Sequence, residues 1–266
     1  MALMEWILIT NDDGVDSPAL VPLVHAIGGL GRVEVVVPDQ ERSWIGKAVT
    51  RHRPVTTDRR ERDGVAIMTT SGYPADCVQL AVHTLYPSPP RLVVSGINVG
   101  YNNGAGYIQS SGTVGAAMEA LLADTPAVAF SAGSHSRPWD VWKRWVHTDE
   151  AAGMWNRLAG IAADIVGRLL AADPPPAVVN VNLPDDATTE TVRTITTVAP
   201  VGYERLFRAD GEGRFVHDFG GGLTSFGSLT GSDVEAAQRG EISITALRPL
   251  GTGAFTPDLA AALTRT

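Results

Sequence analysis

The sequence has little cysteine and no long hydrophobic run. Its single cysteine, Cys77 among 266 residues, excludes a disulfide within the chain and a metal site built from several thiolates. No apolar stretch reaches the roughly 18 residues that a membrane-spanning helix needs. The first ten residues lack the basic region that opens a signal peptide. We therefore expect a cytoplasmic protein with no membrane partner.

Positive charge is also scarce. Lysine and arginine number 21 against 29 aspartates and glutamates, so the formal net charge is −8. A protein that follows a nucleic-acid backbone usually presents a basic face. The one dense basic stretch, residues 51–62, contains acidic residues and is expected to be a solvated hairpin or loop. We expect no nucleic-acid polymer as a partner, and a phosphate-bearing ligand would need a metal ion or backbone N–H groups.

Short apolar segments alternate with helical segments over most of the chain. Runs rich in Val, Ile and Leu that are separated by helices indicate a parallel sheet covered on both faces, which is an α/β fold. The predicted strands are 6–10, 33–37, 65–69, 91–95, 127–131 and 177–183. The predicted helices are 18–27, 75–85, 113–123 and 151–172. Trp139, Trp142 and Trp145 recur at a spacing of three, which predicts packing aromatics on one helix face.

The composition changes after about residue 195, where glycine-rich segments flank short strand-like pieces. We expect an α/β core over residues 1–195 and a β-rich extension over residues 196–266. The extension is predicted to hold a β-hairpin, a strand over 241–247 and a short terminal helix over 256–264. It would pack on the core or on a neighbouring subunit.

Polar residues follow two of the predicted strands. Asp12 and Asp13 come directly after the first strand, and Asn98 follows the strand over 91–95. Ligands of open α/β sheets bind beyond the carboxyl ends of strands. A hard divalent cation such as Mg²⁺ or Mn²⁺ would relieve the repulsion between the two carboxylates, and Asn98 could add a neutral oxygen. Ordinary turn chemistry explains the same residues and stays open as the alternative.

Hydroxyl groups open one of the predicted helices. The segment Ser110-Ser111-Gly112-Thr113 precedes it, and free N–H groups at a helix start form an anion site. Simple capping by Ser or Thr is the commoner explanation, and the two roles can coexist. The histidines show no pair at metal-ligand spacing, and neither a G-x-S-x-G elbow nor a phosphate-binding P-loop is present.

These segments together resemble the SurE family of metal-dependent phosphatases, which act on nucleoside monophosphates. The matching stretches are ILITNDDG (7–14), PDQERS (38–43), PADCVQLAV (74–82), SGINVGYNNG (95–104), SGTVGAAMEA (111–120), VNVNLP (179–184) and GSDVEAAQRGEISIT (231–245). The resemblance implies a Rossmann-like core and an extension that exchanges contacts between subunits. It therefore implies a homodimer or a homotetramer.

The resemblance also implies the site residues. One divalent cation per subunit, Mg²⁺ or Mn²⁺, would be held by Asp12, Asp13, Ser43 and Asn98, and one of the two aspartates is the candidate catalytic base. The phosphate would be lined by Asn102, Ser111, Gly112 and Thr113.

The implied activity is hydrolysis of nucleoside 5′-monophosphates to nucleoside and phosphate. Two alternatives stay open: a phosphatase for another small phosphoester or a short polyphosphate, and a non-catalytic nucleotide-binding protein. The chain departs from the family pattern where Trp44 follows Ser43, where Ala105-Gly106 follows Gly104, and where Ser110 replaces a tyrosine. Residues 134–150 look like added material. These departures concern the walls around the substrate.

Overall fold

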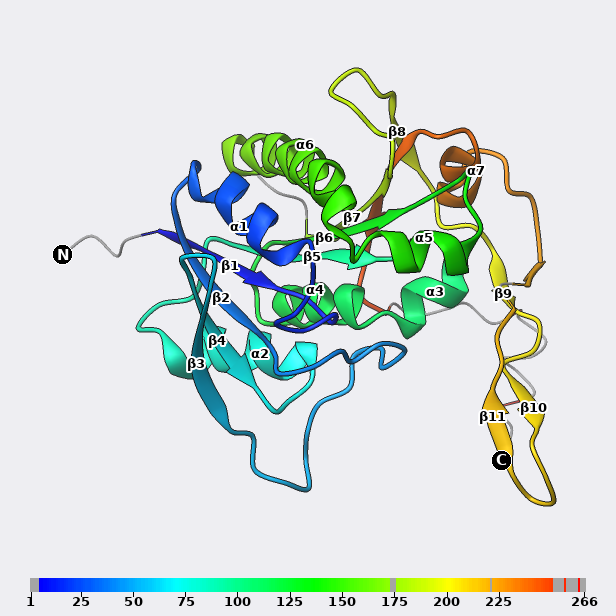
Figure 1. The fold of residues 1–266 in the computed structure, drawn as a ribbon, viewed down its shortest axis with the longest axis horizontal. Coiled ribbons are helices and arrows are strands. Elements are labelled where there is room, and N and C mark those ends of the chain that lie inside the picture. The colour runs from blue at the N-terminus through cyan, green and yellow to red at the C-terminus, as the bar shows by residue number, and fades with distance from the viewer. Residues whose placement is uncertain (1–4, 173–175, 221, 251–255, 257–262, 264–266) are drawn as a thin grey trace.

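A computed structural model of the chain describes residues 5–172, 176–220, 222–250, 256 and 263. Its centre is a nine-stranded sheet in the order β3-β4-β2-β1-β5-β6-β7-β13-β8 (Figure 1). These strands are β1 (Trp6–Thr10), β2 (Arg32–Pro38), β3 (Thr57–Arg62), β4 (Val65–Thr70), β5 (Leu92–Val99), β6 (Ala127–Gly133), β7 (Val178–Pro184), β8 (Arg193–Thr196) and β13 (Ile242–Leu247).

Helices cover both faces of this sheet, as the sequence predicts. They are α1 (Leu20–Gly28), α2 (Pro74–Leu80), α3 (Gly104–Ser110), α4 (Gly112–Leu122), α5 (Trp139–Trp145), α6 (Ala152–Ala171) and α7 (Asp233–Gln238), with a π-helical turn at Ala81–Leu85 and a 3₁₀ turn at Asp149–Ala151. Helices α1 and α6 pack together on one face, and α2 and α4 on the other (Figure 1).

The strand β1 shows why the sheet is buried on both sides. Its residues Ile7 and Ile9 belong to the apolar cluster under α1 and α6. Trp6 and Leu8 belong to the cluster under α2 and α4. Alternate side chains of a strand point to opposite faces, so a continuous apolar run requires cover on both. The predicted α/β fold with a mostly parallel central sheet is confirmed.

The central strands run in one direction. Strand β1 is parallel to β2 and β5, and β5, β6 and β7 are parallel in turn. Their carboxyl ends therefore lie along one edge of the sheet. The basic stretch contributes β3, which is exposed and forms an antiparallel hairpin with β4.

The C-terminal part of the chain shares the central sheet. Strand β13 lies between β7, to which it is antiparallel, and β8, to which it is parallel. The expected boundary between residues 195 and 196 falls inside β8, and the division into two units stays a proposal. Two small ribbons pair β9 (Val201–Tyr203) with β12 (Leu223–Ser225) and β10 (Phe207–Ala209) with β11 (Phe215–His217). The terminal helix expected over 256–264 lies outside the described residues, apart from Thr256 and Leu263.

The three tryptophans of α5 do not share one environment. Trp142 is 1% exposed, whereas Trp139 is 53% exposed. Trp142 is buried as predicted in the apolar cluster under α1 and α6, and Trp145 is partly buried against the same cluster, whereas Trp139 packs against the Trp142 ring with centroids 5.7 Å apart and stays half-exposed. A spacing of three falls short of a full helical turn by about 60°, so successive tryptophans rotate around the helix. None of the helices in the described part of the chain has the length and apolar composition needed to span a membrane.

Candidate metal and phosphate site

Asp12 and Asp13 leave the carboxyl end of β1 together. Asp12 is 3% exposed and Asp13 is mostly buried. The hydroxyl of Thr113, at the start of α4, donates to Asp12 Oδ1 at 2.5 Å. The backbone N–H of Val99, at the end of β5, donates to Asp13 Oδ2 at 3.1 Å. Both carboxylates are thus held by residues from neighbouring elements of the same sheet edge.

This pair is electrostatically unfavourable without a cation. Burial raises the pKa of Asp12 to about 6, against the hydrogen bond from Thr113, which lowers it. The pKa of Asp13 is raised well above its usual range by burial and then by repulsion from Asp12, while the charge of Lys143 lowers it. Two crowded carboxylates that both resist ionisation are stabilised by a doubly charged ion. Their hard oxygen atoms fit Mg²⁺ or Mn²⁺.

Asn98 lies near the carboxyl end of β5, where this strand is irregular. The register of β5 against β6 shifts between Ser95 and Asn98. Gly96 there has a φ of +127°, and a side-chain Cβ would overlap the carbonyl oxygen of Phe130. The amide nitrogen of Asn98 donates to the Gly100 carbonyl at 2.7 Å. Since that bond uses the nitrogen, the amide oxygen remains as a possible ligand, one residue from the Val99 N–H that binds Asp13.

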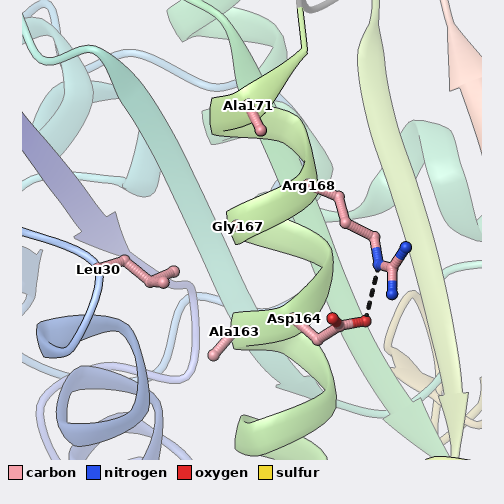
Figure 2. A pocket seen from close by; sticks show the side chains of 6 residues that line it. All are labelled: Leu30, Ala163, Asp164, Gly167, Arg168 and Ala171. Atoms are coloured by element: carbon pink, nitrogen blue, oxygen red, sulfur yellow. Dashed lines mark hydrogen bonds and ion pairs between the residues drawn. The ribbon is translucent and has the colours of Figure 1, made fainter.

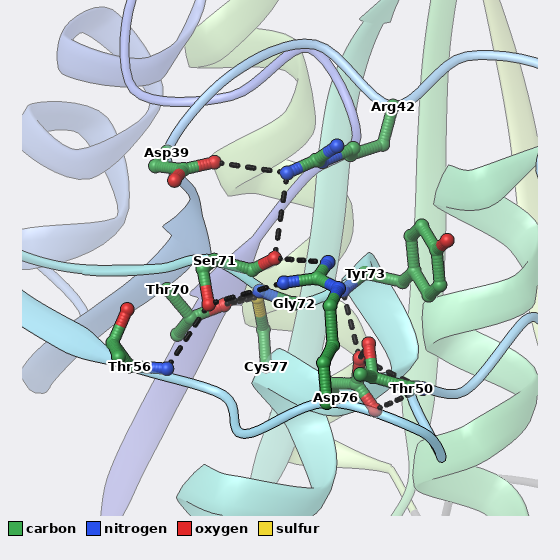
Figure 3. Close-up of polar contacts among 11 residues, drawn as sticks. Asp39, Arg42, Thr50, Thr56, Thr70, Ser71, Gly72, Tyr73, Asp76 and Cys77 are labelled. Atoms are coloured by element: carbon green, nitrogen blue, oxygen red, sulfur yellow. Dashed lines mark hydrogen bonds and ion pairs between the residues drawn. The ribbon is translucent and has the colours of Figure 1, made fainter.

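The loop after β2 brings Ser43 to the same edge. The N–H of Arg42 donates to the Asp12 carbonyl oxygen at 2.7 Å. The guanidinium of Arg42 reaches Asp39 Oδ1 at 3.1 Å and the Ser71 carbonyl at 3.4 Å (Figure 3). The Ser43 hydroxyl donates to Glu41 Oε1 at 2.6 Å. Its proton is therefore occupied, and its oxygen lone pairs are free to bind a cation.

The far end of this loop is held by Asp76, a residue to which the sequence analysis assigned no role. Asp76 accepts the N–H of Thr50 at 3.0 Å and its hydroxyl at 2.6 Å (Figure 3). It also accepts the N–H of Tyr73 at 2.8 Å, at the start of α2. An Asp three residues into a helix is a capping signal, but its link to residue 50 depends on the tertiary fold.

The start of α4 shows which of its two predicted roles each residue takes. Ser111 caps the helix, because its hydroxyl accepts the N–H of Val114 at 3.0 Å. Gly112 packs so closely that a Cβ would lie 2.7 Å from the Cβ of Asp12. The hydroxyl of Thr113 is occupied by Asp12. The segment therefore brings the positive end of the helix dipole to the aspartate pair, and its phosphate contact stays a prediction.

Asn102 is fixed by asparagines of β7. Its N–H donates to Asn182 Oδ1 at 2.8 Å, and its carbonyl accepts the amide of Asn180 at 2.8 Å. Its own amide donates to the Ser131 hydroxyl at 2.8 Å. The next loop residues are tied to the C-terminal part, where buried Asp233 accepts the N–H of Gly104 at 2.9 Å. Alternating asparagines in a buried strand were the available signal for this network.

Two departures from the family pattern meet in one aromatic cluster. We define this cluster as Trp44, Tyr107, Tyr203, His217 and Phe219, in which the Trp44 ring lies 5.0–6.1 Å from the other four. The hydroxyl of Tyr203 donates to the Ser110 hydroxyl at 2.9 Å, so a tyrosine from the C-terminal part contacts the serine that replaces the expected tyrosine.

A second group of possible metal ligands and a surface hollow both involve residues other than the predicted site residues. His135, Asp185 and Asp186 follow β6 and β7, with ligand atoms within 4.8 Å of one another. This group was not predicted from the sequence, although its position after two strands is a signal that could have found it. Arg137 lies 4.0 Å from the Asp185 carboxylate and offsets its charge. Figure 2 shows a hollow between Leu30 and α6 that contains none of the predicted site residues.

The chain is similar to known proteins in both sequence and structure. The family model described as survival protein SurE matches residues 7–205. A 5′-nucleotidase SurE from Geotalea uraniireducens is 39% identical over 91% of this chain and 92% of its own length. One from Geobacter metallireducens is 38% identical over 91% of this chain and 90% of its own length. The crystal structure of the SurE protein from Aquifex aeolicus has a TM-score of 0.75 at 29% identity, covering 98% of this chain and 100% of that chain.

Proposed function

Because this chain belongs to the SurE family, we propose that it is a metal-dependent phosphomonoesterase that hydrolyses nucleoside 5′-monophosphates to nucleoside and phosphate. Relatives that carry the name 5′-nucleotidase match it over nine tenths of its length. The observation that carries the proposal is the buried carboxylate pair at the carboxyl end of β1, which meets the end of β5 and the start of α4.

The proposed ligands of one divalent cation, Mg²⁺ or Mn²⁺, are Asp12, Asp13, Ser43 and Asn98. When bound, such a cation supplies Lewis-acid stabilisation of the charge on phosphoryl oxygens and helps to activate water. Two contacts support this set: the Thr113 hydroxyl donates to Asp12, and the Ser43 hydroxyl donates to Glu41. Such outer contacts tune metal affinity.

The proposed phosphate-binding residues are Asn102, Ser111, Gly112 and Thr113. Backbone N–H groups at the start of an eleven-residue helix favour an anion. One of the two aspartates would also accept a proton from the attacking water, which makes Asp12 and Asp13 the candidate catalytic groups.

A homodimer or homotetramer is the proposed assembly. The β10–β11 ribbon projects from the core in Figure 1. Its Phe207 and Phe215 are 57% and 66% exposed. Apolar rings on a projecting ribbon suit burial against another subunit.

The test is release of phosphate from nucleoside 5′-monophosphates, with Mg²⁺ or Mn²⁺ and after chelation. We expect release only with metal, and a collapse in the Asp12→Asn variant while its circular dichroism stays that of the parent protein. A panel with sugar phosphates and short polyphosphates separates the alternative phosphatases. Nucleotide binding without any release would instead support the non-catalytic alternative.

A further inference from the structure

Helix α5 is firmly attached to the core although most of its surface is exposed. Trp142 is 1% exposed and belongs to the apolar cluster under α1 and α6. The N–H of Trp142 donates to the Pro138 carbonyl at 3.0 Å. The indole N–H of Trp155, in α6, donates to the Val146 carbonyl at 2.9 Å, just after α5 ends. The helix is therefore a fixed support for the side chains on its outer surface.

Trp139 and Lys143 are four residues apart, so they share one side of this helix. The Lys143 Nζ lies 5.8 Å from the centroid of the Trp139 ring. The same indole lies over Gly100, where a Cβ would come within 3.2 Å of the ring. Gly100 in turn accepts the amide of Asn98 at 2.7 Å. This side of α5 thus borders the candidate metal site at the end of β5.

Lys143 has no carboxylate partner among the described residues, unlike the neighbouring Arg144. Arg144 pairs with Asp140 at 3.3 Å on the exposed surface. Among the ion pairs of the described residues, none involves Lys143. Its ammonium lies over the Trp139 ring, which borders Gly100 next to Asn98. The lysine is therefore an exposed cation beside the candidate site, with no carboxylate of its own in the described part of the chain.

We propose that Lys143 is a phosphate-binding residue of this enzyme and that Trp139 forms the wall against which the nucleoside packs. The inference extends the proposed function and rests on it for the identity of the substrate. Two aspartates and a phosphomonoester bring more negative charge than one divalent ion offsets, and a free ammonium adds the missing positive charge. The flat indole, 53% exposed, supplies an apolar surface on which the base of the nucleoside can stack.

The first experiment measures binding of inorganic phosphate to the Mg²⁺-loaded protein by calorimetry, independently of catalysis. We expect Lys143→Gln to weaken phosphate binding about tenfold or more, because a charge-assisted hydrogen bond is lost. Lys143→Arg should retain most of the affinity. Arg144→Gln, on the same helix, should change it less than about twofold. Mg²⁺ affinity of the Lys143→Gln protein should be unchanged or slightly higher, since a repelling charge is removed.

Equal phosphate affinity in Lys143→Gln and the parent protein would overturn the proposal. So would a parallel loss of Mg²⁺ affinity, which would indicate damage to the site. If the parent protein binds phosphate through Lys143 but releases none from nucleoside monophosphates, the proposed function fails and the phosphate site stands.

The second experiment distinguishes the contact of Trp139 with the base from the binding of the phosphate group. We expect Trp139→Ala to raise KM for adenosine 5′-monophosphate about fivefold, by loss of base stacking, and Trp139→Phe to raise it less. Neither variant should raise KM for ribose 5-phosphate more than about twofold. An equal rise for both substrates would contradict contact with the base.

Discussion

The floor and the walls of the candidate site are built differently. The floor, Asp12 with Asp13 and Thr113, is buried and held by hydrogen bonds between β1, β5 and α4. The walls are rings and a cation on the surface: Trp44 is 43% exposed and Trp139 53% exposed. A change in the floor is expected to disturb metal binding, whereas a change in a wall is expected to alter only the surface that meets the substrate. We therefore expect substitutions to affect metal binding and substrate choice separately.

The largest expected effect is on the floor. Asp13→Asn should lower phosphate release about 10³-fold, since a charged ligand worth several kcal/mol of charge stabilisation is lost. The metal-free variant should unfold at the same temperature as the parent or higher, because repulsion with Asp12 is relieved. Steady-state kinetics and calorimetric melting measure both. Asp16→Asn, exposed near the same turn, is the control and should change neither. A strongly destabilised Asp13→Asn protein would contradict the repulsion argument.

A smaller effect on activity is expected at Thr113, which contacts Asp12 and is not itself a proposed metal ligand. Thr113→Val keeps the shape but removes the hydroxyl that orients Asp12, and should lower metal affinity or activity about 10–100-fold. Titration with Mg²⁺ measures the affinity. Thr125→Val, at the other end of α4 and also buried, is the matched control. If Thr113→Val binds Mg²⁺ as the parent does, the hydroxyl has no part in preparing the floor.

Lowering the pH should weaken the binding of Mg²⁺ to the aspartates of the floor. The pKa of Asp12 is raised to about 6, so its protonated form is favoured in the metal-free fold. That contribution to stability is complete below its usual pKa of about 3.9 and is lost as the pH rises through about 6. Mg²⁺ must displace this proton, so its affinity should fall about tenfold per pH unit below 6. The increase in melting temperature caused by Mg²⁺ should therefore shrink between pH 7.5 and 5. An equal increase in melting temperature at both pH values would contradict the competition between Mg²⁺ and this proton.

The smallest effect is expected at the other wall. Trp44→Ala removes the ring at the centre of the aromatic cluster, next to Ser43. We expect a rise of about two- to fivefold in KM for nucleoside monophosphates, within the energy of one aromatic pair, and no change in Mg²⁺ affinity. Trp44→Phe should restore most of the loss. A large fall in Mg²⁺ affinity would show that this wall also supports the floor.

Much of the floor was predictable. Parallel strands place their carboxyl ends on one edge, so the aspartates after β1 and Asn98, near the end of β5, were expected at the same edge. The contact between Val99 and Asp13 is in line with that expectation. The supports of the site were not predictable in this way. Asp233 and Asn182 hold the loops of the phosphate side across 129 and 80 residues, and no local pattern encodes such distances.

The order of apolar and polar segments in the chain by itself determined the covered parallel sheet, because alternate strand residues need burial on both faces. It also determined that oxygen donors stand at strand ends. Only the tertiary structure decided which side chains surround them. The exposure of Trp139, the position of the Lys143 ammonium over its ring and the contact of Tyr203 with Ser110 all depend on how the chain packs. Packing brings together residues far apart in the chain, and it is packing that assigns each of them a partner or leaves it to a ligand.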